Sequence, residues 1–144
     1  IRKALADKNI KTANKYLGYN FMLSGKVVNG KQLGGQIGFP TANISIEETY
    51  KLIPKTGVYI VKSVIDSLLV FGMMNIGFRP TINGKHQTIE VHFFDFNANL
   101  YNQNLTVEIL YFLRDEEKFT SVEELISQLK IDKFNALNYL QNNL

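Results

Sequence analysis

Two neighbouring segments with a two-residue repeat constrain the fold of this chain more than any other feature. They are QTIEVHFFDF at 87–96 and LTVEILYFLR at 105–114, and the polar stretch NANLYNQ joins them. Alternation of apolar and polar side chains over this length is typical of a β-strand with one buried face. These segments are the strongest strand predictions in the sequence, and they favour a mainly β domain.

Four further segments upstream also have the composition of strands. One of them ends at Asn29-Gly30 and two others meet near Asp66-Ser67, and both dipeptides are turn signals. RPTINGKH at 79–86 contains another Asn-Gly and is predicted to form a turn. The four segments are NFMLSGKVVN at 20–29, TANIS at 41–45, GVYIVKSVI at 57–65 and LLVFGMMNIG at 68–77.

Helical patterns occupy both ends of the chain. Ser121 followed by Glu124 is a capping-box pattern that begins a C-terminal helix. At the other end Ile1–Leu17 has helical spacing, with Asn9 placed to cap its second part and Gly18 placed to end it. About six strands and one long helix predict a small closed antiparallel barrel with a helix packed against it. The predicted buried stripe of that helix is Leu125, Ile126, Leu129, Leu137 and Leu140.

The composition limits the classes of function. The 144 residues suit one domain, and the absence of cysteine excludes disulfides, thiolate metal sites and a thiol nucleophile. The formal net charge of +3 is spread along the chain, whereas nucleic-acid-binding proteins usually carry a denser basic stripe. No apolar run is long enough to span a membrane. We therefore expect no nucleic acid and no membrane as partners, and a cytoplasmic location.

The stretch GFPTANI at 38–44 contains the first candidate site. In an extended chain Thr41 and Asn43 project to the same side, and Pro40 stiffens the approach to them. Two neutral oxygens suit a hard cation such as magnesium if phosphates supply the charge. On spacing alone, a turn in which both side chains satisfy main-chain groups is the more common arrangement.

A glycine-rich stretch directly precedes this pair and favours a phosphate site. Glycine lets main-chain N–H groups approach a phosphate closely. The stretch is not a P-loop, because no GKS or GKT closes it and no helix follows. Barrels also use glycine at their corners. The glycines are Gly25, Gly30, Gly34, Gly35 and Gly38.

The two strongest strands carry the remaining candidates. Glu90 shares a face with His92 and Phe94, and it either faces solvent or lines a pocket in which it accepts a proton from a substrate hydroxyl. His92 is placed to orient Glu90, although an isolated histidine in a strand more often has a structural role. Arg114 either meets a phosphate or a planar ring, or it pairs with the acidic residues 115–117.

Four motifs, taken together, resemble the riboflavin kinase family. They are GFPTAN at 38–43, NIGFRPT at 75–81, IEVHFFDF at 89–96 and LR followed by EEKF at 113–119. More narrowly, the chain resembles the C-terminal kinase domain of the bacterial bifunctional riboflavin kinase/FAD synthetase from about Tyr19 onward. IRKAL resembles the segment that follows the adenylyltransferase domain of such proteins. We therefore expect 1–18 to be a helical linker from a missing N-terminal adenylyltransferase-like domain, and 19–144 to be the kinase domain.

The resemblance implies a fold, a reaction and a set of site residues. The fold is a six-stranded antiparallel Greek-key barrel, and the reaction transfers the γ-phosphoryl group of ATP to the ribityl 5′-hydroxyl of riboflavin, giving FMN and ADP. Thr41 and Asn43 would hold Mg²⁺ with the nucleotide phosphates, and Glu90 would be the general base. The joined adenylyltransferase domain would convert FMN to FAD. The implied ATP-binding residues are Gly25, Val27, Gly30, Gly34, Gly35, Gly38 and Pro40, and the implied substrate-binding residues are Asn75, Arg114 and Glu117.

Two positions depart from the family pattern. Gly35 stands where the family usually carries an arginine, so a phosphate contact is lost or falls to Lys26 or Lys31. Asn102 stands where the family favours glycine, and asparagine tolerates a positive φ better than most residues. The first departure leaves open a non-catalytic flavin- or nucleotide-binding barrel. A nucleic-acid-binding barrel, as in OB-folds, would need a basic, aromatic face that these strands lack.

Overall fold

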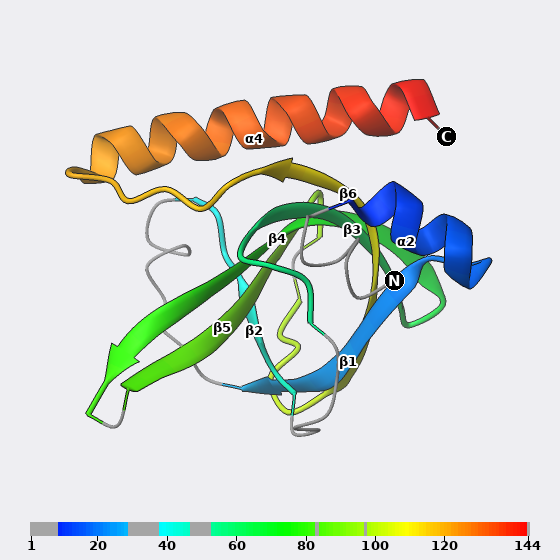
Figure 1. The fold of residues 1–144 in the computed structure, drawn as a ribbon, viewed down its shortest axis with the longest axis horizontal. Coiled ribbons are helices and arrows are strands. Elements are labelled where there is room, and N and C mark those ends of the chain that lie inside the picture. Colours follow the sequence, from blue (N-terminus) through cyan, green and yellow to red (C-terminus); the bar gives the residue numbers. More distant parts are fainter. Residues whose placement is uncertain (1–8, 29–37, 47–52, 83, 97, 144) are drawn as a thin grey trace.

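Six antiparallel strands form the body of the molecule. The computed structural model describes residues 9–28, 38–46, 53–82, 84–96 and 98–143. Its strands close into a barrel in the order β1-β2-β5-β4-β3-β6 (Figure 1). The elements are α2 (Ile10–Leu17), β1 (Phe21–Val28), β2 (Ala42–Ser45), β3 (Gly57–Ile65), β4 (Leu68–Thr81), β5 (Gly84–Phe93), β6 (Asn104–Arg114) and α4 (Val122–Asn143). The predicted mainly β architecture with helices at both ends is confirmed.

The strand connections follow a Greek key. β3, β4 and β5 are successive hairpin partners, and β6 returns to lie beside β3, which is the defining order of this motif. Asp66 and Ser67 connect β3 to β4 with φ values of 51° and 68°. Positive φ at both central residues is the geometry of a type I′ hairpin turn, so the turn predicted at these two residues is confirmed.

The prediction for RPTINGKH at 79–86 was wrong in its extent. β4 continues to Thr81 and β5 begins at Gly84, and the two strands pair along this whole stretch. β3 pairs with β4 only as far as Ile76, so beyond that point the hairpin is a two-stranded ribbon (Figure 1). A proline is tolerated there because none of the described strands pairs with the other edge of β4 beyond Ile76.

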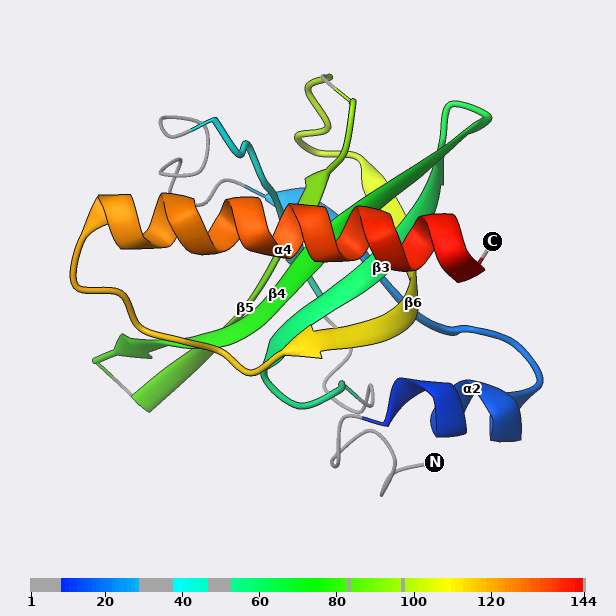
Figure 2. The same ribbon diagram turned by 90° about the horizontal axis from the view of Figure 1, so that it is seen from above.

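The apolar side chains form two separate cores. One fills the barrel, where alternate residues of the strands, such as Leu23, Tyr59 and Val107, are fully buried. The other lies between the outer face of the wall and α4, and it includes Ile60 and Ala136. Figure 2 shows α4 crossing over β4, β3 and β6. β3 is therefore buried on both faces, which explains its nearly continuous apolar sequence.

The N-terminal helix α2 packs against the barrel. The Asn9 side chain caps it by accepting a hydrogen bond from the Thr12 N–H (3.1 Å), and Gly18 ends it with a φ of 78°. Both were predicted, although residues 1–8 of the expected segment lie outside the described residues. Ile10 and Ala13 are buried in the barrel core, so this helix belongs to the packed unit.

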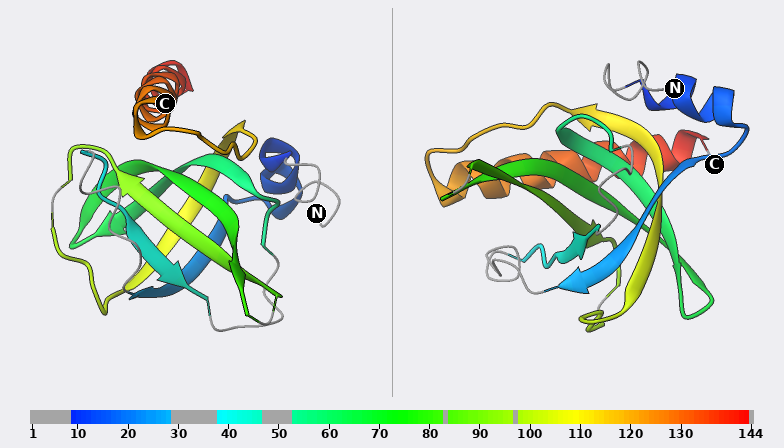
Figure 3. Two further views of the ribbon diagram at one scale, coloured as in Figure 1. Left: turned by 90° about the vertical axis from the view of Figure 1, so that its left-hand side faces the viewer. Right: turned by 60° about the horizontal axis from the view of Figure 1, so that its bottom comes forward.

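The C-terminal helix α4 begins at the predicted cap. Its buried stripe agrees with the prediction in part, since Leu140 is buried and Leu129 packs against the outer core. The Glu124 N–H donates to Ser121 Oγ (3.1 Å), and the Glu124 carboxylate accepts from the Thr120 N–H (3.2 Å). Leu137, predicted to be buried, is 42% exposed. Seen nearly end-on in the left view of Figure 3, α4 touches the barrel along one side only. No helix in the described part of the chain has the length and apolarity needed to cross a bilayer.

Candidate active site

A row of directly paired residues crosses five strands on the outer face of the barrel. Glu90 on β5 pairs with Asn43 on β2 on one side and with Asn75 on β4 on the other. The row continues through Val58 on β3 to Arg114 on β6. Direct cross-strand partners have Cβ atoms about 4.5–5.5 Å apart, so Glu90 stands between two amide side chains. The fold thus joins predicted site residues from separate segments.

The row borders a small pocket between the barrel wall and α4, here named the α4 pocket. Its volume is about 80 Å³. Glu90 and His92 point into it because the other face of β5, with Ile89 and Val91, is buried in the barrel. The predicted division of β5 into two faces is confirmed. The pocket is lined by Phe39, Thr41, Val58, Met73, Asn75, Glu90, His92, Arg114, Leu129 and Asp132.

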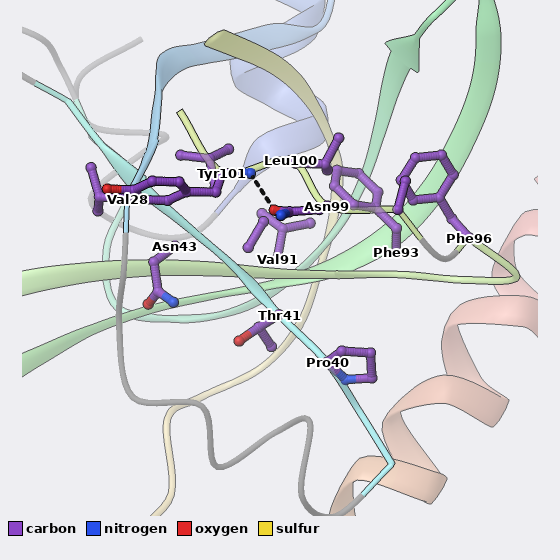
Figure 4. Close-up of a pocket in the computed structure, with 13 residues that line it drawn as sticks. Val28, Pro40, Thr41, Asn43, Val91, Phe93, Phe96, Asn99, Leu100 and Tyr101 are labelled. Atoms are coloured by element: carbon purple, nitrogen blue, oxygen red, sulfur yellow. Dashed lines mark hydrogen bonds between the residues drawn. The ribbon is translucent and has the colours of Figure 1, made fainter. Parts of the chain in front are cut away.

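A second pocket lies at the edge of the barrel, beside the loop between β5 and β6, and is named the loop pocket. Its volume is about 190 Å³, and Val27, Pro40, Thr41 and Asn43 line it. Figure 4 shows Thr41 and Asn43 projecting from one side of the segment that leads into β2, as the two-residue spacing predicted. Thr41 lines both pockets. It therefore stands where the two spaces meet.

His92 is fixed by three contacts. Its Nδ1 lies 2.8 Å from the main-chain oxygen of Pro40. Its ring makes edge-to-face contacts with Phe39 and Phe94, at centroid distances of 5.2 and 5.8 Å. Burial lowers the pKa of His92 below its ordinary value and the charge of Lys133 acts in the same direction, while the Pro40 hydrogen bond opposes them. The ring is therefore neutral at neutral pH.

The guanidinium group of Arg114 is held mainly by α4. Its Nε and Nη2 each donate to a carboxylate oxygen of Asp132 at 2.8 Å, and its Nη1 donates to the main-chain oxygen of Asp115 at 2.9 Å. Asp132 is almost fully buried and also accepts from Gln128 (2.9 Å). Arg114 thus makes a two-point ion pair with Asp132 across the α4 pocket, which the sequence did not predict.

The remaining predicted residues are less close together. Glu117 is exposed and borders a shallow groove along the start of α4, outside both pockets. Gly38 has a φ of 89°, which glycine adopts without strain. Gly30, Gly34 and Gly35 lie outside the described residues.

Gly25 has a packing role in the described part of the barrel. A Cβ atom at this position would meet the main-chain oxygen of Ser45 and the side chain of Ile44 on the neighbouring strand. Its predicted contact with ATP is a separate question, because the close approach of two strands already requires a glycine.

We expect Gly25→Ala to destabilise the fold by about 1–3 kcal/mol, because the added methyl group forces β1 and β2 apart. Urea unfolding measures this difference. Lys26→Ala, an exposed neighbour on the same strand, is the control and should change the stability by less than about 0.5 kcal/mol. Equal stability of Gly25→Ala and wild type would contradict the packing role.

The loop between β5 and β6 contributes residues that the sequence analysis missed. Asn99, Leu100 and Tyr101 line the loop pocket, and the Asn99 side chain accepts from the Tyr101 N–H at 3.0 Å (Figure 4). The Asn102 N–H donates to the main-chain oxygen of Val27 at 2.9 Å, and the φ of Asn102 is 71°. Asparagine thus keeps the turn in place of glycine, as expected. The asparagine at position 102, where the family favours glycine, was the sequence feature that could have drawn attention to this loop.

The described residues fit the magnesium ion that the family resemblance implies. Among them, no three His, Cys, Asp or Glu side chains come together as a metal-binding group. Thr41 and Asn43 offer neutral oxygens, and Asn43 belongs to the row that contains Glu90. Such a set suits an ion that keeps most of its shell as water and nucleotide phosphates.

Comparison with known proteins gives consistent relatives. The family model described as riboflavin kinase (flavokinase) matches residues 17–140. The chain is 44% identical over 133 residues to the bifunctional riboflavin kinase/FMN adenylyltransferase of Haemophilus influenzae, covering 92% of this chain and 42% of that protein. It is 38% identical over 145 residues to the protein of the same name from Bacillus subtilis, covering 99% of this chain and 46% of that protein. The chain thus spans less than half the length of these relatives.

Two solved structures are similar in fold. A riboflavin kinase from Trypanosoma brucei has a TM-score of 0.58 at 26% identity, covering 85% of this chain and 80% of that one. A Streptococcus pneumoniae protein named as a macrolide-efflux protein has a TM-score of 0.88 at 37% identity, covering 95% of this chain and 45% of that one. Its name differs from the others, so the assignment rests on the family model and the curated relatives.

Proposed function

This chain belongs to the riboflavin kinase family, and we propose that it transfers the γ-phosphoryl group of ATP to the ribityl 5′-hydroxyl of riboflavin, giving FMN and ADP. One observation carries the proposal beyond family membership. Thr41 lines both the α4 pocket and the loop pocket, and Asn43, two residues further along the chain, pairs directly with Glu90. A residue shared by two pockets suits a reaction that brings two substrates together.

In this proposal each pocket takes one substrate. Phosphoryl transfer depends mainly on positioning and on neutralising charge. The nucleotide phosphates occupy the loop pocket, beside Val27 and Pro40, and the ribityl chain reaches Glu90 through the α4 pocket. Glu90 accepts the proton of the attacking hydroxyl. Asn75, the partner of Glu90 on β4, is placed to hold the ribityl chain, and Arg114 supports the wall of the pocket through Asp132.

Magnesium completes the proposed site. Thr41 and Asn43 are the residues that would hold the ion with the nucleotide, and the ion would neutralise phosphate charge. Their oxygens carry no charge, so affinity for the ion depends on ATP being present. The chemistry of the donor set, the same-side projection of the two side chains and their place in the loop pocket support this assignment.

We expect Thr41→Ala to raise the magnesium concentration needed for half-maximal FMN formation by at least about 10-fold, since even outer-shell partners of a bound metal contribute 10- to 100-fold to affinity. A magnesium titration at saturating ATP measures the change. Thr41→Ser keeps the oxygen and is the matched control. Identical titrations for the alanine variant and wild type would refute the ligand assignment.

Phosphate transfer from ATP to riboflavin in the presence of magnesium tests the function itself. FMN is separated from riboflavin by chromatography, and its formation should require both ATP and the ion. Absence of FMN at saturating substrates would favour a non-catalytic flavin- or nucleotide-binding barrel, for which the glycine at position 35 was the motivating feature.

The relatives suggest a second activity in the full-length protein. Those from H. influenzae and B. subtilis are named as bifunctional and are more than twice as long as the matched region. We propose that the native chain also carries an FMN adenylyltransferase domain, joined before residue 19, that converts FMN to FAD. A cytoplasmic location remains a prediction of the sequence.

A further inference from the structure

His92 ties the segment that carries Thr41 to the wall of the barrel. Its Nδ1 lies 2.8 Å from the Pro40 oxygen. Because a carbonyl oxygen only accepts hydrogen bonds, the Nδ1 nitrogen must carry the proton. The ring also lies between Phe39 and Phe94, which pack against it edge-on. The donor is therefore fixed in direction.

No backbone pairing in the described strands does the same for Thr41. β2 pairs with β5 at Ala42 and Asn43, and Thr41 precedes the strand. Pro40 has no N–H and cannot extend the ladder as a donor. The hydrogen bond from the His92 side chain thus takes the place of the next main-chain hydrogen bond between β2 and β5.

We propose that His92 is a positioning residue for Thr41: by holding the Pro40 carbonyl, it directs the Thr41 hydroxyl to the side on which Asn43 lies. The inference rests on the proposed function, because it concerns the residues assigned to magnesium and the nucleotide phosphates. Because Nδ1 is engaged by Pro40, only Nε2 of His92 is left for its expected role of orienting Glu90.

Two amide substitutions separate this role from simple packing. In His92→Asn the amide nitrogen takes the place of Nδ1, whereas in His92→Gln it takes the place of Nε2. Calorimetry of a non-hydrolysable ATP analogue, repeated over a magnesium series, measures the half-saturating magnesium concentration without turnover. FMN formation over the same series gives the value for the reaction.

We expect His92→Gln to raise the half-saturating magnesium concentration about 3- to 10-fold in both measurements. This is the change expected from the loss of one hydrogen bond. His92→Asn should stay within about 2-fold of wild type, since it restores that bond. A lower kcat with an unchanged magnesium requirement, or equal behaviour of the two amides, would overturn the inference.

The outcomes also separate this inference from the kinase proposal. If wild type forms no FMN but the two amides still differ in magnesium-dependent nucleotide binding, the kinase proposal fails and the positioning role stands. If the glutamine variant does not fold, a measurement on the wild-type protein still tests the positioning role. Nitrogen NMR of the imidazole should find the proton on Nδ1, and a proton on Nε2 would overturn the role.

Discussion

Replacing Glu90 with glutamine is expected to lower the rate of FMN formation about 100- to 10,000-fold, the usual contribution of a general base. Glutamine keeps the size of the side chain but cannot accept the proton of the ribityl hydroxyl. ATP binding should remain close to wild type, because the substitution removes a base and not a ligand of the nucleotide. Single-turnover FMN formation and calorimetry of nucleotide binding measure the two quantities.

The control for this prediction is Glu123→Gln, which makes the same chemical change at an exposed site in the first turn of α4. It should have wild-type turnover. A Glu90→Gln enzyme with wild-type turnover would rule out the base role. A variant that lost both turnover and nucleotide binding would indicate that Glu90 instead helps to keep its cross-strand neighbours in place.

Replacing Asp132 with asparagine is expected to lower the free energy of unfolding by about 3 kcal/mol. Breaking one side of a buried ion pair costs about 3–5 kcal/mol, because the other charge stays buried without compensation. The Arg114 side chain is 19% exposed and keeps its bond to the Asp115 oxygen, which places the expected loss at the lower end. Urea unfolding followed by circular dichroism measures it.

Two further variants identify the cause of that loss. Asp66→Asn makes the same change in an exposed turn and should shift the stability by less than about 0.5 kcal/mol. The double substitution Arg114→Met with Asp132→Leu removes both charges and should recover most of the stability, as apolar replacements of buried ion pairs often do. If the double variant is less stable than the single one, the pair itself is the source of stability.

The fold was predictable wherever local chemistry dominates. Alternating segments gave the strands, Asn9 and Gly18 gave the limits of α2, and Ser121 gave the start of α4. The prediction failed where a local turn signal competed with long-range pairing. Asn83-Gly84 was recognised as a turn, but the sequence contains no sign that β4 and β5 pair on both sides of it beyond the barrel.

The prediction of the buried stripe of α4 failed at Leu137 for a related reason. Residues 129, 132, 136 and 140 lie on the side of α4 that faces the barrel, and position 132 is an aspartate. A search for apolar spacing passes over a charged residue and selects Leu137 in its place. Asp132 is buried because its partner Arg114 comes from a different element, and such a pairing is visible only in three dimensions.

The site shows the same limit. Motifs identified Thr41, Asn43 and Glu90 one by one, and the spacing predicted the shared side of the first two. That Asn43, Glu90 and Asn75 are cross-strand neighbours follows from the barrel order, in which β5 lies between β2 and β4. The Pro40 contact of His92 likewise depends on where β2 stops pairing with β5.

The presence of two cores has a consequence for how the molecule fluctuates. The α4 pocket lies in the outer core, and its volume of about 80 Å³ is well below the roughly 300 Å³ that a drug-sized ligand usually needs. Cooperative units of different stability open independently in native proteins. Separation of α4 from the barrel wall exposes only the outer core. The amide protons of α4 should therefore exchange with solvent through openings that leave the barrel closed. In the proposed reaction riboflavin would enter through this opening, while the strands that hold Glu90 keep their register.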